Sequence, residues 1–120
     1  MKRILVVDDE EDIRTLAVRT LVSVGIDVVS AIDGNEALRY MNEIDFDLVL
    51  LDYRMSNKNG LEVIQEMKKI DRLKGIPVIL FSAFQSIKDE AIGVDDYLEK
   101  PFTRDEFLQK VVKYVSIERD

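Results

Sequence analysis

Short apolar runs rich in β-branched residues recur along the chain, and longer segments with helical spacing of apolar positions separate them. The runs are Ile4–Val7, Asp27–Ala31, Asp47–Leu51 and Pro77–Phe81, with a weaker fifth candidate at Asp95–Lys100. Uninterrupted apolar runs of this length are typical of strands that are covered on both faces, and such strands form parallel sheets. The pattern therefore predicts a parallel sheet buried between two layers.

The segments around these runs carry apolar residues at i, i+3 and i+4, the spacing of a helix that buries one face. They are residues 13–24, which Gly25 is placed to end; 37–44; 61–73, which stops near Gly75; and 107–115, opened by a capping box of Thr103 and Glu106. Between Ser82 and Gly93 there is room only for a short or irregular helix. Strands that alternate with helices form right-handed βαβ units, so we expect one doubly wound α/β domain over residues 1–120.

The residues at the ends of the apolar runs are the most informative about function. In open α/β sheets, ligands bind beyond the carboxyl ends of the strands, where the strand order reverses. Asp8 and Asp9 follow the first run, Asp52 the third and Ser82 the fourth, while Lys100 closes the fifth. We therefore expect three carboxylates, a hydroxyl and an ammonium group to converge at one edge of the sheet.

Each of these residues also has a purely structural interpretation. Asp8 or Asp9 could cap the following helix, and Glu11 and Asp12 would complement the dipole of its first turn. Asp52 could simply start a turn. A serine in a loop and a lysine on the surface are common. Four polar strand ends together are harder to explain by structure alone.

Composition narrows the chemistry. The 120-residue chain is 47% hydrophobic, carries a net charge of −7 and contains neither Cys nor His. This charge repels a phosphate backbone, so we expect no direct binding of nucleic acid. No apolar run approaches the roughly 18 residues of a membrane span, and a cytoplasmic domain is the expectation. Catalysis and metal binding would have to rely on carboxylates, hydroxyls, lysines and backbone groups.

Such groups suit two kinds of chemistry. Oxygen ligands without His or Cys favour Mg²⁺ or Ca²⁺ over zinc, and a cation between Asp9 and Asp52 would relieve the repulsion among the carboxylates. An aspartate can also act as a nucleophile towards phosphorus and form an aspartyl phosphate. Lys100 and the metal would then neutralise the transferring phosphoryl group, and Ser82 would donate a hydrogen bond to it.

At these residues the sequence resembles the receiver domain of two-component response regulators. The resemblance covers essentially the whole chain, through "ILVVDDEEDIR", "DLVLLDYRMSNKNGLEV", "PVILFSA" and "GVDDYLEKPF". It implies a flavodoxin-like fold, in which a single five-stranded parallel sheet of order 2-1-3-4-5 has helices on both faces.

The resemblance also implies a role for each residue at the expected metal site. Asp52 matches the phosphoacceptor, and Asp9 matches the acidic residue that binds Mg²⁺ directly, with Mn²⁺ as a possible substitute. Asp8 matches its neighbour, which acts mainly through a metal-bound water. The backbone carbonyl of Arg54 matches the third protein ligand.

Further residues match the groups that respond to phosphorylation. Ser82 occupies the Ser/Thr position that moves towards the phosphoryl group, and Tyr97 matches the aromatic switch residue that then turns inward. Lys100 matches the lysine that contacts phosphate, and its bond to Pro101 is expected to be cis.

By this resemblance, a sensor histidine kinase or phosphotransfer protein donates a phosphoryl group to Asp52, and the domain catalyses its own phosphorylation and dephosphorylation. The added charge would bias a surface formed by the fourth helix, the fifth strand and the last helix, and an effector domain or protein would read that surface. The same face is a candidate for homodimerisation. We expect the chain to be a stand-alone regulator or a fragment of a longer one.

The chain departs from the family pattern at three places. Ser56 stands where the family often has proline, which predicts a more mobile loop after Asp52. The interval from Ser82 to Gly93 is about one helical turn short, which affects the expected output surface. Phe84 flanks the phosphoryl site, where its bulk would restrict the attacking water and predicts a long-lived phosphoaspartate.

Two alternatives remain open. A phosphatase of the haloacid dehalogenase type would use Asp8 as nucleophile, supported by Ser82, Lys100 and the pair Asp95 and Asp96. The order of residues argues against it, because the acidic pair should follow the lysine. A pseudo-receiver would share the fold and bind proteins without being phosphorylated, although this chain keeps the full set of acidic residues and lysine.

Overall fold

A parallel five-stranded sheet forms the centre of the molecule. A computed structural model describes residues 1–82 and 94–116. The strands are β1 (Arg3–Val7), β2 (Asp27–Ala31), β3 (Leu48–Asp52), β4 (Val78–Ser82) and β5 (Asp96–Glu99), in the order β2-β1-β3-β4-β5. All four strand pairs are parallel. The predicted fold class and strand order are confirmed.

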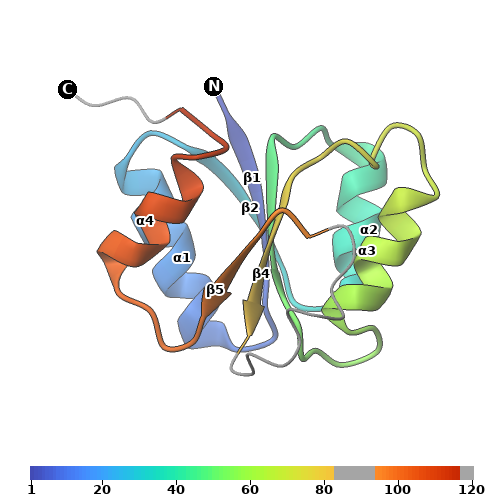
Figure 1. Cartoon of the computed structure of the whole chain (residues 1–120), viewed down its shortest axis with the longest axis horizontal. Coiled ribbons are helices and arrows are strands. Elements are labelled where there is room, and N and C mark those ends of the chain that lie inside the picture. The colour runs from blue at the N-terminus through green and yellow to red at the C-terminus, as the bar shows by residue number, and fades with distance from the viewer. Residues whose placement is uncertain (83–93, 117–120) are drawn as a thin grey trace.

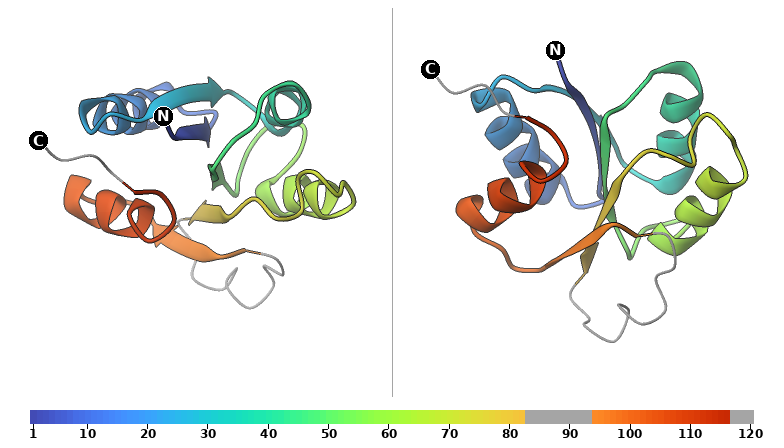
Figure 2. Two further views of the ribbon diagram at one scale, coloured as in Figure 1. Left: turned by 90° about the horizontal axis from the view of Figure 1, so that it is seen from above. Right: turned by 45° about the horizontal axis from the view of Figure 1, so that its top comes forward.

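Helices cover both faces of this sheet, as Figures 1 and 2 show. The described helices are α1 (Glu11–Ser23), α2 (Gly34–Glu43), α3 (Gly60–Lys68) and α4 (Arg104–Val111). α1 and α4 lie on one face, and α2 and α3 lie on the other. α4 is the last of the predicted helices, and its expected capping box of Thr103 and Glu106 is present.

The uninterrupted apolar runs follow directly from this layering. In β1, Ile4 and Val6 belong to the core beneath α1 and α4, whereas Leu5 and Val7 belong to the core beneath α2 and α3. Successive side chains of a strand point to opposite faces, so a strand between two helical layers needs apolar residues at every position. The first four residues of β3, all apolar, are buried for the same reason.

The third helix is shorter than the sequence pattern predicts. α3 ends at Lys68, earlier than the predicted end near Leu73. The N–H groups of Ile70 and Leu73 bond carbonyls three residues back, so this segment forms tight turns that still bury Leu73 completely. The predicted short helix between Ser82 and Gly93 lies outside the described residues, as does Phe84.

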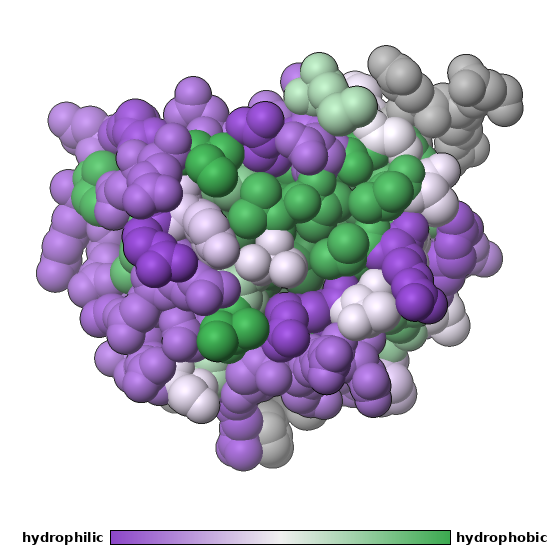
Figure 3. Space-filling model, turned by 180° about the vertical axis from the view of Figure 1, so that it is seen from behind, coloured by the Kyte–Doolittle hydropathy of each residue, from purple (hydrophilic) through white to green (hydrophobic). Residues whose placement is uncertain are grey.

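One face of the molecule carries a broad apolar area. Figure 3 shows apolar side chains gathered on the face opposite to the view of Figure 1, where β2 forms the edge of the sheet. Val22 in α1 is 57% exposed, and Val24, Val28 and Val29 are half-buried. Across the described parts of the chain, every helix is too short or too polar to span a membrane.

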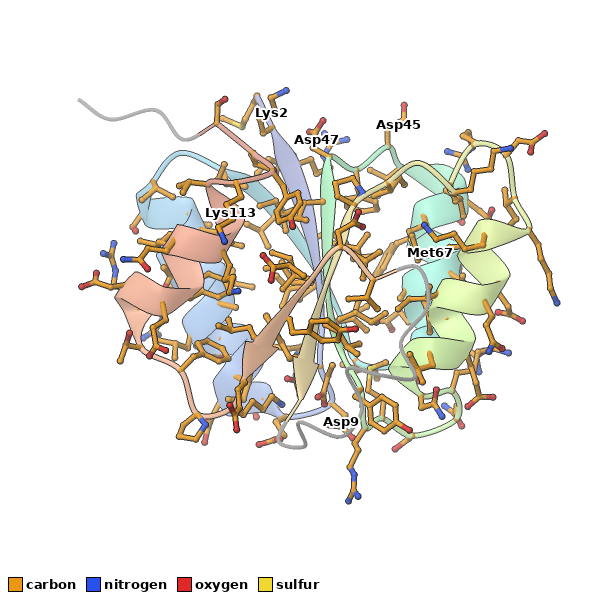
Figure 4. The ribbon with its side chains drawn as sticks, viewed as in Figure 1. Lys2, Asp9, Asp45, Asp47, Met67 and Lys113 are labelled. Atoms are coloured by element: carbon orange, nitrogen blue, oxygen red, sulfur yellow. The ribbon has the colours of Figure 1, made fainter. Side chains whose placement is uncertain are left out.

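A cavity opens at the end of the sheet where the strands begin. Met1 is almost fully exposed at its rim. The lining residues come from the start of the chain, the α1–β2 and α2–β3 connections and the segment after α4: Met1, Lys2, Gly25, Ile26, Asp47 and Ser116. Figure 4 shows Lys2 and Asp47 at this end and Asp9 at the opposite end.

Candidate functional site

Lys100 joins two buried carboxylates at the carboxyl ends of the strands. Asp8 follows β1 and is fully buried, and Asp52 is the last residue of β3 and is 4% exposed. Lys100 Nζ lies 3.0 Å from Asp8 Oδ2 and 3.2 Å from Asp52 Oδ1. The sheet order places β1 beside β3, so residues 44 positions apart in sequence share one ammonium group.

Asp8 is fixed by backbone contacts rather than by capping the helix. Its Oδ1 accepts the Glu10 N–H at 2.9 Å, and its carbonyl accepts a hydrogen bond from Arg14 Nη1 at 2.9 Å. The N-cap residue of α1 is Glu10, whose side chain makes no capping bond. The capping interpretation of Asp8 and Asp9 is therefore wrong, whereas Glu11 and Asp12 do lie in the first turn of α1.

Four acidic residues meet at this point. Carboxylate oxygens of Asp8, Asp9, Glu10 and Asp52 all lie within 4.8 Å of one another. Asp9 and Glu10 are exposed, and Figure 4 shows Asp9 at the surface beyond the strand ends. Because these donors are all hard oxygen atoms and two of them are open to solvent, the cluster could hold Mg²⁺ with several of its waters.

The electrostatics of the cluster are unfavourable for free carboxylates. Burial raises the pKa of Asp52 from 3.8 to about 7, and the neighbouring charge of Asp8 adds to this rise, while Lys100 opposes it. Burial alone would lower the pKa of Lys100, but its hydrogen bond with Asp8 and the charges of Asp52 and Asp8 raise that pKa above its usual value. Lys100 therefore stays charged, and the carboxylates retain an excess negative charge that a cation would neutralise.

The loop after Asp52 is closed tightly against β3. Gly60 N donates to the Tyr53 carbonyl at 2.8 Å, and Asn59 forms a capping box with Glu62. A Cβ atom on Gly60 would lie 2.8 Å from the Asp52 carbonyl oxygen, so no larger residue fits without displacing β3. Arg54 lies in this loop with an exposed side chain.

The other predicted residues also lie at or near this edge. Ser82 ends β4 in register with Glu99, the residue before Lys100, and the Lys100–Pro101 bond is cis as expected. Tyr97 is half-buried against the core on the α2 and α3 face. The structure brings Asp8, Asp9, Asp52 and Lys100 together, and the roles of these residues, Ser82, Arg54 and Tyr97 remain predictions.

Glu10 joins the acidic cluster, although the sequence pattern predicts no role for it. Its Oε1 lies 3.5 Å from Lys100 Nζ, although the side chain is 62% exposed. Its position directly after Asp8 and Asp9 is the one sequence feature that points to the site. However, where a chain enters a helix, a third carboxylate can point towards the site or away from it. The contact with Lys100 could be recognised only once the two segments were placed together.

The acidic pair required by the phosphatase alternative lies elsewhere. Asp96 begins β5 and pairs with Lys110 Nζ at 2.8 Å, and Asp95 Oδ2 accepts the Val78 N–H at the start of β4. Both residues therefore lie at the opposite end of β5 from Lys100 and cannot support an attack by Asp8. The structure removes the arrangement on which that alternative depended.

Comparisons with known proteins agree with this geometry. A family model described as the response regulator receiver domain matches residues 4–112. The chain is 40% identical over 119 residues to the CAI-1 autoinducer sensor kinase/phosphatase CqsS of Vibrio cholerae, covering 95% of this chain and 17% of that protein. It is 37% identical to the uncharacterized transcriptional regulatory protein YrkP of Bacillus subtilis, covering 92% of this chain and 48% of the relative. The chain thus spans half or less of these relatives.

A solved structure gives the same result. The response regulator protein TrrA of Thermotoga maritima, described in complex with Mg²⁺–BeF, is 38% identical, with a TM-score of 0.88. The match covers 96% of this chain and 100% of the TrrA chain. With the sheet order, the strand-end acidic cluster and the family match in agreement, this chain belongs to the family of response regulator receiver domains.

Proposed function

We propose that this receiver domain accepts a phosphoryl group on Asp52. The observation that carries the proposal is the contact of Lys100 Nζ with both Asp8 and Asp52 at the carboxyl end of the sheet. In the proposed step an Asp52 oxygen attacks phosphorus, the bond from phosphorus to the donor histidine nitrogen breaks, and the imidazole keeps the electron pair. Lys100 neutralises charge on the transferring group.

A magnesium ion is proposed to assist this transfer, with Mn²⁺ as a substitute. Asp9, Asp52 and the Arg54 carbonyl would bind it directly, and Asp8 would act through a water. The cluster of carboxylate oxygens within 4.8 Å supports this proposal, as does the description of TrrA in complex with Mg²⁺–BeF. When bound, the ion would supply positive charge to the phosphoryl oxygens.

The response to phosphorylation is proposed to pass through β5. Ser82, at the end of β4, would move to donate a hydrogen bond to the new phosphoryl group, and Tyr97 on the paired strand would turn inward. β4 and β5 are paired from Ile79 to Ser82, which supports a connection between the two residues. The predicted output surface, which combines β5, the last helix α4 and the short helix expected outside the described residues, would then be read by an effector domain or protein, or by a second copy of the chain.

The phosphoryl donor is proposed to be a sensor histidine kinase or a phosphotransfer protein. The matched segment of CqsS is part of a protein named as a sensor kinase, and YrkP is named as a transcriptional regulatory protein. Receiver domains thus occur beside both kinds of partner.

The net charge of −7 favours protein partners with basic surfaces over direct contact with nucleic acid. A cytoplasmic location follows from the proposed kinase partner.

Intact-mass measurement tests the proposal. The protein is incubated with Mg²⁺ and acetyl phosphate, and we expect a gain of one phosphoryl group that is lost in Asp52→Asn and in the presence of EDTA. Asp45→Asn, an exposed change outside the cluster, is the matched control and should be phosphorylated normally. A pseudo-receiver would gain nothing in any variant, and that result would contradict the proposal.

A further inference from the structure

We propose that Asn57 and Asp33 act as positioning residues that hold the loop after β3 in the conformation needed for metal binding. This inference rests on the proposed function, because the loop carries Arg54, whose carbonyl is the proposed third metal ligand. It assigns a task at the site to two residues that are not metal ligands themselves.

The contact joins two separate connections of the fold. Asp33, the N-cap of α2, uses both carboxylate oxygens: Oδ1 accepts the Glu36 N–H at 2.8 Å, and Oδ2 accepts a hydrogen bond from Asn57 Nδ2 at 3.1 Å. Asn57 has a φ of 70°, the left-handed conformation that Asn and Asp tolerate best among residues other than glycine. This backbone conformation and the side-chain bond to Asp33 occur in the same residue.

The same two connections also pack closely. A Cβ atom on Gly34 would lie 2.8 Å from Lys58 Cβ and 2.7 Å from Val63 Cγ2. The start of α2 therefore lies directly against the end of the loop and the first turns of α3. The Asn57–Asp33 bond fixes the polar side of this contact, and Gly34 allows its close approach.

The loop needs such a restraint. Its ends are fixed by Asp52 in β3 and by the bond from Gly60 N to the Tyr53 carbonyl at 2.8 Å. Between these points the chain has Ser56, not a conformationally fixed proline. A metal ligand must be held within about 0.5 Å of its working position. The link from Asn57 to the rigid start of α2 supplies a fixed point in the middle of the loop.

An exchange of the two side chains tests the pair. Asn57→Asp keeps a residue suited to the left-handed conformation but places two carboxylates together, so the loop should be released. The double variant Asp33→Asn with Asn57→Asp restores one donor and one acceptor, and asparagine caps a helix as well as aspartate does. Asn35→Asp adds the same charge at an exposed site in α2 and is the matched control.

Two measurements are made on each variant: Mg²⁺ affinity by calorimetry, and amide hydrogen exchange of residues 53–59 in metal-free protein. Mutation of residues that support metal ligands typically lowers metal affinity about 10–100-fold. Because this contact is exposed, we expect Asn57→Asp to weaken Mg²⁺ binding about 3–10-fold and to speed amide hydrogen exchange in the loop. The double variant should return to within about twofold of wild type on both measures. Added negative charge alone would strengthen Mg²⁺ binding, so the direction separates positioning from electrostatics.

The possible failures are distinguishable. Wild-type protein that takes up no Mg²⁺ would contradict the proposed function, and exchange alone would then decide whether the pair restrains the loop. Wild-type Mg²⁺ affinity in Asn57→Asp, or no recovery in the double variant, would overturn the positioning role while leaving the proposed function intact.

Discussion

At the scale of single residues, the site consists of carboxylates held at positions where their negative charge is energetically unfavourable. Asp52 is 4% exposed and lies beside the buried Asp8, and Lys100 is the cation whose ammonium group contacts both carboxylates. The pKa of Asp52 is about 7 in the folded protein, compared with 3.8 for a free aspartate side chain. The residue expected to react is therefore also a source of instability in the metal-free protein.

This predicts a pH-dependent gain in stability for Asp52→Asn. Between pH 4 and 7 the unfolded carboxyl loses its proton while the folded one keeps it, so wild-type stability falls as pH rises through that window. Asparagine does not titrate. In EDTA, the stability of Asp52→Asn relative to wild type should rise by about 2 kcal/mol from pH 5 to pH 8, measured by urea unfolding. A difference that stays constant with pH would contradict the shifted pKa.

At the scale of elements, the junction of β3 and α3 sets the position of Asp52. A Cβ atom on Gly60 would lie 2.8 Å from both the carbonyl oxygen of Asp52 and Leu80 Cδ1, so Gly60 contributes to the site through packing rather than chemistry. Its small size could not be read as a requirement from sequence, because a glycine that starts a helix after a turn has several ordinary explanations.

Gly60→Ala should therefore destabilise the protein. The added Cβ would lie 2.8 Å from a backbone oxygen, which can move only with the strand. We expect a loss of about 2 kcal/mol in urea unfolding, together with slower phosphorylation of Asp52. Gly75→Ala is the control, because nothing lies within 4 Å of the Cβ position at Gly75. The stability of this variant should be unchanged or slightly higher than that of wild type. Equal effects of the two substitutions would refute the packing argument.

A second junction joins β5 to α4. Asp96 accepts hydrogen bonds from Lys110 Nζ at 2.8 Å and from the Tyr97 N–H at 2.8 Å. Burial alone would raise the pKa of Asp96, but these bonds and the charges of Lys110 and Lys113 lower it below 3.8. The ionised carboxylate thus ties the strand that carries Tyr97 to the last helix.

Asp96→Asn should cost stability at neutral pH and cost less in acid. The contribution of a carboxylate with a lowered pKa is present above its unfolded pKa and disappears as pH falls through the folded value. We expect a loss of about 1 kcal/mol at pH 7 that shrinks at pH 3, measured by urea unfolding. Asp71→Asn removes a surface pair in which the aspartate side chain is 95% exposed, and should change stability little at either pH. A larger loss at pH 3 would contradict the sign.

The elements also show what sequence could and could not predict. The strands could be predicted because a sheet covered on both faces needs apolar residues at every position. The ends of these strands then indicated Asp8, Asp52 and Lys100 as site residues. The end of α3 could not be predicted, because Leu73 is buried in a turn as fully as it would be in a helix. The contact of Asn57 with Asp33 has no signature in the sequence, because it joins two connections whose packing depends on the completed fold.

At the scale of the whole molecule, binding at the acidic cluster should be linked to folding. A cation that binds only the folded protein stabilises it by mass action, by about 2.7 kcal/mol at a concentration 100 times its Kd. Mg²⁺ should therefore raise the Tm above that in NaCl of the same ionic strength. Asp9→Asn should remove this increase, because Asp9 is an exposed member of the cluster.

Asp12→Asn provides the matched control for that measurement. It removes the same charge from the first turn of α1 without touching the cluster, so the increase with Mg²⁺ should persist. Loss of the increase in both variants would show that Mg²⁺ acts on the general negative charge of the protein and not on a defined site.

The parallel sheet has a further consequence for how the molecule can be tethered. Met1 and Ser116 line the same cavity at the end where the strands begin, while Asp9 and Lys100 lie at the end where the strands finish. A fusion partner, dye or solid support attached before Met1 would therefore hold the domain with its acidic cluster pointing outward. A docking protein could approach the cluster without passing the attachment, so a tethered sample suits measurements of transfer between two proteins.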